Sequence, residues 1–154
     1  MTGENAKVYR DTGGDRQVVA SGGSIVVQSG GVFDNNGAVA NATITVGNES
    51  SDVRAIGIQL KDAQGNNLTI RQAVTLYVFA DANGDAFSAG GSTGIAIGTD
   101  GLLSTLVAKK HFEVISEDNG HIDLTWTDTG TAAAFLGVKL PNGKLVISAA
   151  MTNT

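Results

Sequence analysis

The chain of 154 residues has no cysteine, only one proline and few aromatic residues: one Trp, two Tyr and five Phe. The lack of cysteine excludes disulfides, thiolate metal sites and thiol catalysis. It also removes the case for a small secreted scaffold that depends on disulfides. A chain of this length can bury roughly 70% of the surface that its unfolded form exposes, so it can support a core without such crosslinks.

Positive charge is also scarce, with ten Lys and Arg against fifteen Asp and Glu and a formal net charge of −5. Lys109-Lys110 is the only adjacent basic pair. Binding to the phosphates of a nucleic acid needs clustered basic side chains. We therefore expect no nucleic-acid partner.

Long apolar runs are missing as well. No stretch approaches the roughly 20 apolar residues of a membrane-spanning helix, so we expect no membrane partner. Residues 1–7 contain one lysine with no apolar run after it, and we expect no secretion signal there.

Glycine, by contrast, is abundant, with 21 residues. This is roughly twice the number that the average usage of about 7% would give. Glycine relaxes the steric limits on the backbone, so a glycine-rich folded chain usually has many tight turns or closely packed backbones. Alanine, threonine and asparagine are frequent too. This composition is typical of short strands joined by turns rather than of helices.

A short repeat runs through the first part of the chain. Its unit is a glycine doublet followed by a short apolar run, which indicates a turn and then a strand of about five residues. The doublets recur at spacings of nine and eight residues, in Thr12-Gly13-Gly14, Ser21-Gly22-Gly23 and Ser29-Gly30-Gly31. The apolar runs are Val18-Val19, Ile25-Val26-Val27 and Val32-Phe33.

Strands this short cannot build a core alone, and eight or nine residues cannot close one turn of a β-helix. We therefore predict that residues 1–42 form an oligomerisation segment, in which several copies build a shared, β-helix-like prism with a homotrimer as the simplest closure. Its interface would contain Val18, Ile25, Val27 and Val32. A small meander packed on the main domain is one alternative. A flexible glycine-rich leader is another, although disordered leaders are poor in β-branched residues.

The remainder, residues 43–154, alternates between short strand patterns and turn signals. Seven to nine such strands without a helical period predict an all-β fold, an Ig-like β-sandwich with a barrel as the alternative. Trp126 is expected to anchor the core. Residues 102–107 are assigned as a strand, although the stretch 102–110 could instead be helical. The clearest strand patterns are 43–46, 56–60, 74–79, 122–127, 135–140 and 145–150.

Four Asn-Gly pairs, at 36–37, 83–84, 119–120 and 142–143, supply the positive φ angles of tight hairpin turns. The last two lie between good strand patterns. They predict hairpins over Glu113–Thr127 and Phe135–Ala150.

One motif matches a serine nucleophile. Gly90-Gly91-Ser92-Thr93-Gly94 fits G-x-S-x-G, and Asp100 and His111 follow in the order of a catalytic triad. A nucleophile elbow needs a helix after the serine, whereas here a β-branched run follows. In a chain this rich in Gly and Ser the match is expected by chance. We predict no catalytic residues and no enzymatic activity.

Two patterns resemble metal sites. Asp81, Asn83 and Asp85 match the start of a calcium loop, but Ala86 and Ser92 occupy the positions that require glycine and glutamate. A polar turn is the better interpretation.

His111 and His121 could bind zinc across neighbouring strands if Glu113 or Asp123 turned the same way. A third ligand is not evident from the spacing. We predict no metal site and no cofactor.

Residues 8–24 resemble the amino-terminal segment of tailed-bacteriophage virion proteins, in which a tyrosine, a basic residue and Gly-Gly precede Ser-Gly-Gly repeats. The matching residues are Tyr9, Arg10, Gly13-Gly14 and Ser21-Gly22-Gly23. The β-sandwich domain that accompanies this segment is similar to residues 58–65, 81–85, 96–101 and 140–146. Together these segments span most of the chain. Such proteins are similar to capsid decoration, or cement, proteins.

The resemblance implies a structural virion protein that binds the outer surface of a tailed-phage head as a homotrimer and stabilises it. Its partner would be the major capsid protein, contacted by Lys7, Tyr9 and Arg10. It would be synthesised in the cytoplasm of the host bacterium and act in the virion. Because the same modules occur in head and tail fibres, a receptor-binding, adhesin-like module is the alternative, which would require an exposed aromatic or sugar-binding cleft.

Overall fold

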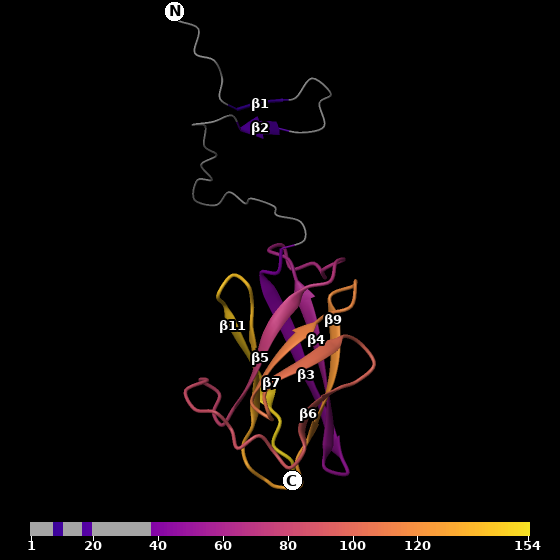
Figure 1. The fold of residues 1–154 in the computed structure, drawn as a ribbon, viewed down its shortest axis with the longest axis vertical. Coiled ribbons are helices and arrows are strands. Elements are labelled where there is room, and N and C mark those ends of the chain that lie inside the picture. Colours follow the sequence, from indigo (N-terminus) through magenta and orange to yellow (C-terminus); the bar gives the residue numbers. More distant parts are fainter. Residues whose placement is uncertain (1–7, 11–16, 20–37) are drawn as a thin grey trace, which may run out of the picture. The chain divides into compact units, whose positions relative to one another are not determined.

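The computed structural model describes residues 8–10, 17–19 and 38–154, and the chain divides into two compact units, Met1–Phe33 and Asp34–Thr154. In the first unit, β1 (Val8–Arg10) pairs antiparallel with β2 (Gln17–Val19), as Figure 1 shows. The strand expected at Val18-Val19 is therefore present. The rest of the glycine-doublet repeat lies outside the described residues, and the shared prism stays a prediction.

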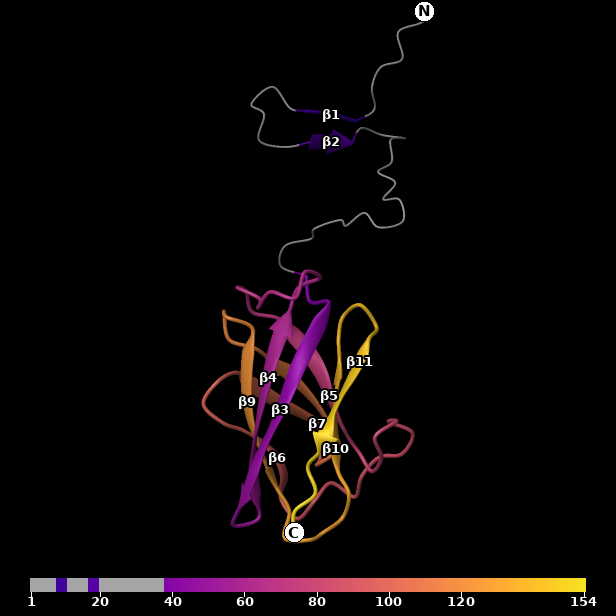
Figure 2. The ribbon, with the colours of Figure 1, turned by 180° about the vertical axis from the view of Figure 1, so that it is seen from behind.

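The second unit is a sandwich of two antiparallel sheets (Figures 1 and 2). One sheet has four strands in the order β3 (Asn41–Ser50), β4 (Val53–Lys61), β9 (His121–Thr127) and β6 (Gly94–Ile97). The other has five, in the order β11 (Leu145–Ala150), β10 (Phe135–Lys139), β5 (Ala73–Phe79), β8 (His111–Ile115) and β7 (Leu102–Val107). No helix occurs among the described residues, so the predicted all-β sandwich is confirmed.

Strict alternation along the central strands places one face of each sheet in the core. Every second residue of β9 and of β4 from Ile56 onwards is buried while its neighbours are exposed or half-buried. β5 alternates in the same way from Ala73 to Val78, and Phe79 at its end is buried as well. Trp126 is fully buried, as expected, and its Nε1 has no hydrogen-bond partner among the described residues. The largest fully buried side chains include Phe112, Trp126, Ile56, Ile58, Leu60, Leu76, Ile122, Leu124, Leu136 and Leu140.

Of the two predicted hairpins, Phe135–Ala150 is confirmed, because β10 pairs with β11. The hairpin over Glu113–Thr127 is wrong. β8 pairs with β5 and β7, whereas β9 pairs with β4 and β6 in the other sheet. The turn around Gly120 thus carries the chain across the core, so that Phe112 and Trp126 enter it from different sheets.

The glycine-rich loop before β6 has a packing role. Gly91 has a φ of 67°, and a Cβ atom there would lie 2.8 Å from the Cη2 atom of Trp126. Only glycine allows the backbone to lie this close to the buried indole ring. The loop therefore covers the end of the core.

The C-terminal residues close the same fold by polar contacts. Asn153 is buried, and its Nδ2 donates to the carbonyl oxygens of Asp52 and Asp128, each at 2.7 Å. Its Oδ1 accepts a hydrogen bond from Arg54 Nε at 3.0 Å. The carbonyl of Thr152 accepts another from Arg54 Nη2 at 2.6 Å. These bonds tie the tail to the β3–β4 turn and to the end of β9.

Candidate functional site

The residues predicted to contact other chains all lie in the first unit. Tyr9 is opposite Val18 in the β1–β2 pair, and Arg10 is opposite Gln17. Four others, Lys7, Ile25, Val27 and Val32, lie outside the described residues. The predicted oligomer interface and capsid contact therefore both stay predictions.

Ser92 does not occupy a nucleophile elbow. Its Oγ accepts a hydrogen bond from the backbone N–H of Thr129, and its own N–H donates to Asp128 Oδ1. The strand β6 follows it where the motif requires a helix. Asp100 contacts His121, at 2.8 Å between Oδ2 and Nδ1, and not the His111 of the sequence match.

The two histidines lie in different sheets, so they do not face each other across a hairpin. His111 stacks on Tyr77 with ring centroids 4.6 Å apart and planes 20° apart. In the part of the chain that the structure describes, no group of three His, Asp or Glu side chains is arranged to hold a metal ion.

The partial calcium motif at Asp81 is a turn that its own carboxylate organises. Oδ1 accepts backbone N–H bonds from Asn83, Gly84 and Asp85, and Oδ2 accepts one from Ala86. These bonds, the one from Asp85 foremost, hold the pKa of Asp81 below its ordinary value. Both carboxylate oxygens thus accept hydrogen bonds from the backbone of the same loop.

A second carboxylate, that of Asp62, also accepts hydrogen bonds from its own turn, in the connection between β4 and β5. Burial opposes the ionisation of Asp62, but hydrogen bonds from the side chain and backbone of Asn66 and from the backbone of Gln64 outweigh it and lower its pKa. Since both carboxylates bind protons less readily in the folded chain, the unfolded chain takes up more protons as the pH falls.

We expect the free energy of unfolding to be highest above about pH 5 and to fall towards pH 3, as the carboxylates with lowered pKa become protonated. Asp81→Asn should flatten this fall, measured by urea denaturation at several pH values. Asp118→Asn, which removes an exposed carboxylate that accepts no hydrogen bond from the described residues, is the matched control. Identical slopes for the two variants would contradict the role of Asp81.

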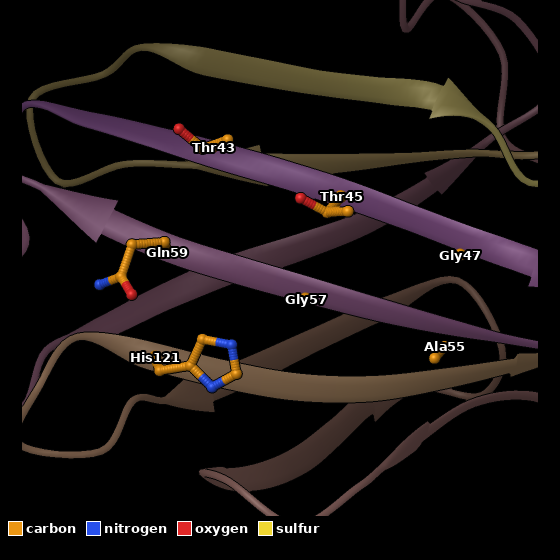
Figure 3. A pocket seen from close by; sticks show the side chains of 7 residues that line it. All are labelled: Thr43, Thr45, Gly47, Ala55, Gly57, Gln59 and His121. Atoms are coloured by element: carbon orange, nitrogen blue, oxygen red, sulfur yellow. The ribbon is translucent and has the colours of Figure 1, made fainter.

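The outer face of the four-stranded sheet has a shallow hollow of about 340 Å³ (Figure 3). Gly57 forms its floor, where a Cβ atom would lie 3.6 Å from Nε2 of His121. Figure 3 shows the imidazole ring lying beside Gly57, with Thr43 and Thr45 on the neighbouring strand. The hollow offers hydroxyl, amide and imidazole groups. The lining is Thr43, Thr45, Gly47, Ala55, Gly57, Gln59 and His121.

The outer face of the five-stranded sheet carries an aromatic cluster that we define as Tyr77, Phe79 and Phe87. Phe79 and Phe87 stack with centroids 5.6 Å apart, and Tyr77 lies 5.8 Å and 6.0 Å from them. Phe87 is 55% exposed. A hollow of about 290 Å³ adjoins the cluster and is also lined by Lys139 and Leu145. This is the largest gathering of rings among the described residues.

Two members of this cluster could be predicted from the sequence. In the segment 74–79, Tyr77 and Phe79 occupy the positions that alternate with the buried aliphatic residues, which places both on the outer face. Phe87 lies outside this segment and joins the cluster because the chain folds back at the Asp81 turn, which bridges Phe87 to Phe79.

Comparisons with known proteins assign no family. No family model matches the chain, and no curated protein matches it. Among solved structures, the archaellum periplasmic stator protein complex FlaF and FlaG from Sulfolobus acidocaldarius is similar over 81% of this chain and 96% of that chain, with 13% sequence identity and a TM-score of 0.31. A search of the described residues for a helix that could span a membrane found none.

Proposed function

We propose that this chain is a structural virion protein, a capsid decoration protein that binds the outer surface of a tailed-phage head as a homotrimer and stabilises it. The observation that carries the proposal is the pairing of two sequence features. The tyrosine, basic residue and glycine-doublet repeats of residues 8–24 precede a domain with the segment resemblances given above.

The sandwich supports this proposal through the way its reactive side chains are used. Ser92, Asp81 and His111 each take part in local packing or turn hydrogen bonds. A decoration protein needs a rigid fold and adhesive surfaces rather than catalysis. A ligand that binds only the assembled shell stabilises that shell by mass action.

In this proposal the two parts of the chain have separate tasks. Residues 1–42 join three copies through Val18, Ile25, Val27 and Val32. The preceding Lys7, Tyr9 and Arg10 contact the major capsid protein, and tyrosine and arginine are enriched in protein interfaces. Localisation on the virion follows from that contact.

Titration of the purified full-length chain onto undecorated phage heads tests the proposal. We expect saturable binding in multiples of three copies, and a higher temperature of head rupture. Arg10→Ala should lower the occupancy, measured by sedimentation with heads and quantitative gel analysis. Arg71→Ala is the matched control, since Arg71 forms only an exposed ion pair with Glu117 in the sandwich, and such pairs contribute about 1 kcal/mol or less. Equal occupancy for the two variants would remove the assignment of Arg10.

A receptor-binding module of a fibre is the second candidate, and the aromatic cluster favours it. Tyr77, Phe79 and the exposed Phe87 lie beside a hollow of about 290 Å³, and recognition sites are commonly apolar hollows with a few polar groups. Binding to host cells or glycans without binding to heads, abolished by Phe87→Ala, would favour this candidate over decoration.

A further inference from the structure

Four strands lie at the edges of the two sheets: β3 and β6 in one, β7 and β11 in the other. β3 and β11 contact each other, so they close one side of the sandwich (Figures 1 and 2). On the other side, β6 has only four residues. Short edge strands offer little backbone for pairing with another chain. β6 and β7 also contact each other, and β7 is the longer edge strand on this side.

The sequence of β7, Leu-Leu-Ser-Thr-Leu-Val, contains no charge and no proline. Leu102, Leu106 and Val107 are 60%, 54% and 51% exposed. Natural edge strands are usually blunted by charged residues, prolines or bulges. Only the last device occurs here, as one register shift between Thr105 and Val107, so the stretch from Leu102 to Thr105 keeps a regular ladder. Such an edge is suited to the addition of a further strand.

The charges that flank β7 indicate which partner strand pairs with it. Asp100 precedes the strand and Lys110 follows it. When two copies of β7 run antiparallel, the acidic end of one comes beside the basic end of the other, at both ends of the pair. The exposed Leu102 of one copy then lies near Leu106 or Val107 of the other. A single patch that is complementary to itself in this way is what a two-fold interface requires.

We propose that β7 pairs antiparallel with β7 of a second copy around a two-fold axis at Ser104 or Thr105, which joins two five-stranded sheets into one continuous sheet. The exposed aliphatic side chains, together with Ile115 beside Leu102, become one buried strip across the axis. The contact uses the sandwich alone and is independent of residues 1–42.

A two-fold contact in the sandwich adds a second kind of symmetry to the assembly of copies. If residues 1–42 form the trimer, a consequence that rests on the proposed function, each copy links its own trimer to a neighbouring one. Three-fold and two-fold contacts together connect the trimers into a network, whereas the three-fold contact alone gives separate trimers. Decoration would then brace a shell laterally as well as radially.

Disulfide crosslinking tests the proposal directly, because the chain has no cysteine of its own. A residue on the two-fold axis of an antiparallel pair lies opposite its own copy at a Cα separation of roughly 4.5–5.5 Å. This is within the range of about 4.4–6.8 Å that a disulfide spans. Ser104→Cys and Thr105→Cys, each in the full chain, place one thiol at the expected axis. Both positions are exposed, so both variants should fold.

Under mild oxidation, one of the two variants should form a covalent dimer about tenfold faster than the control Gln64→Cys, because pairing raises the effective thiol concentration. Gln64 lies in an exposed turn. The readout is a non-reducing gel over time. Crosslinking of both variants at the rate of the control overturns the proposal.

Thr105→Lys supplies an independent check, since it places two ammonium groups close together, at an axis on Thr105 or beside an axis on Ser104. It should lower the mass found by sedimentation equilibrium, to that of a trimer if residues 1–42 associate and otherwise to that of a monomer, and leave the far-ultraviolet circular dichroism spectrum unchanged. Thr69→Lys, on an exposed turn, should change neither. An unchanged mass for Thr105→Lys overturns the proposal. Binding to phage heads is measured separately, so failure of this contact and failure of the decoration function remain distinguishable.

Discussion

Replacing Trp126 with alanine should lower the free energy of unfolding by about 4 kcal/mol, which is a large part of the roughly 5–15 kcal/mol that stabilises a typical domain. The indole ring is fully buried between the two sheets, and the loop at Gly91 packs directly on it. Alanine would leave a cavity that neither sheet can close without breaking its ladder. Urea denaturation followed by circular dichroism is the measurement, since the variant has no tryptophan to report by fluorescence.

Phe87→Ala is the matched control for this prediction. Phe87 is 55% exposed, so its removal should cost less than about 1 kcal/mol. Trp126→Phe should fall between the two, because it keeps part of the ring volume and removes an Nε1 donor that has no partner among the described residues. Equal effects of Trp126→Ala and Phe87→Ala would show that the core is not centred on Trp126.

Replacing Asn153 with alanine should cost about 3 kcal/mol, although the residue is the last but one of the chain. The substitution removes one hydrogen bond each from the carbonyl groups of Asp52 and Asp128 and from the Nε of Arg54, although the Asp52 carbonyl still accepts the backbone N–H of Asp128. Buried polar groups that lose a hydrogen bond keep the full cost of their desolvation. The effect is measured as a change in urea midpoint at constant slope.

Asn67→Ala is the matched control, because Asn67 is exposed and its side chain makes no hydrogen bond within the described residues. A loss below about 0.5 kcal/mol is expected for it. If Asn153→Ala behaved in the same way, the tail would not be a structural part of the sandwich, and its contacts with Arg54 would not contribute to stability.

How well each candidate site could be predicted depends on how close its residues lie in the sequence. The polar turn at Asp81 was predictable, because the carboxylate, Asn83 and Gly84 act within one short loop. The strand that follows the serine motif, where a nucleophile elbow has a helix, was also predictable from its β-branched run. Only part of the aromatic cluster could be predicted, since Phe87 lies outside the strand pattern of 74–79 and joins Tyr77 and Phe79 across the Asp81 turn.

The contact between Asp100 and His121 lay beyond prediction for a related reason. The two residues are 21 positions apart, and the hydrogen bond forms because β9 lies in the four-stranded sheet rather than beside β8. The sequence pattern paired Asp100 with His111, which the fold places on the other sheet.

The sequence by itself determined that the second unit is an all-β sandwich with Trp126 in its core, because a period of two shows which face of each strand is buried. It also determined the hairpin at Asn142-Gly143, since its turn and both strands are adjacent in the chain. Only the tertiary structure decided which strands are neighbours, and so that β8 and β9 lie in different sheets and that β7 forms an open edge. The physical reason is that ladder hydrogen bonds join backbone groups, which are the same in nearly every residue, so the side-chain pattern carries little information about the partner strand.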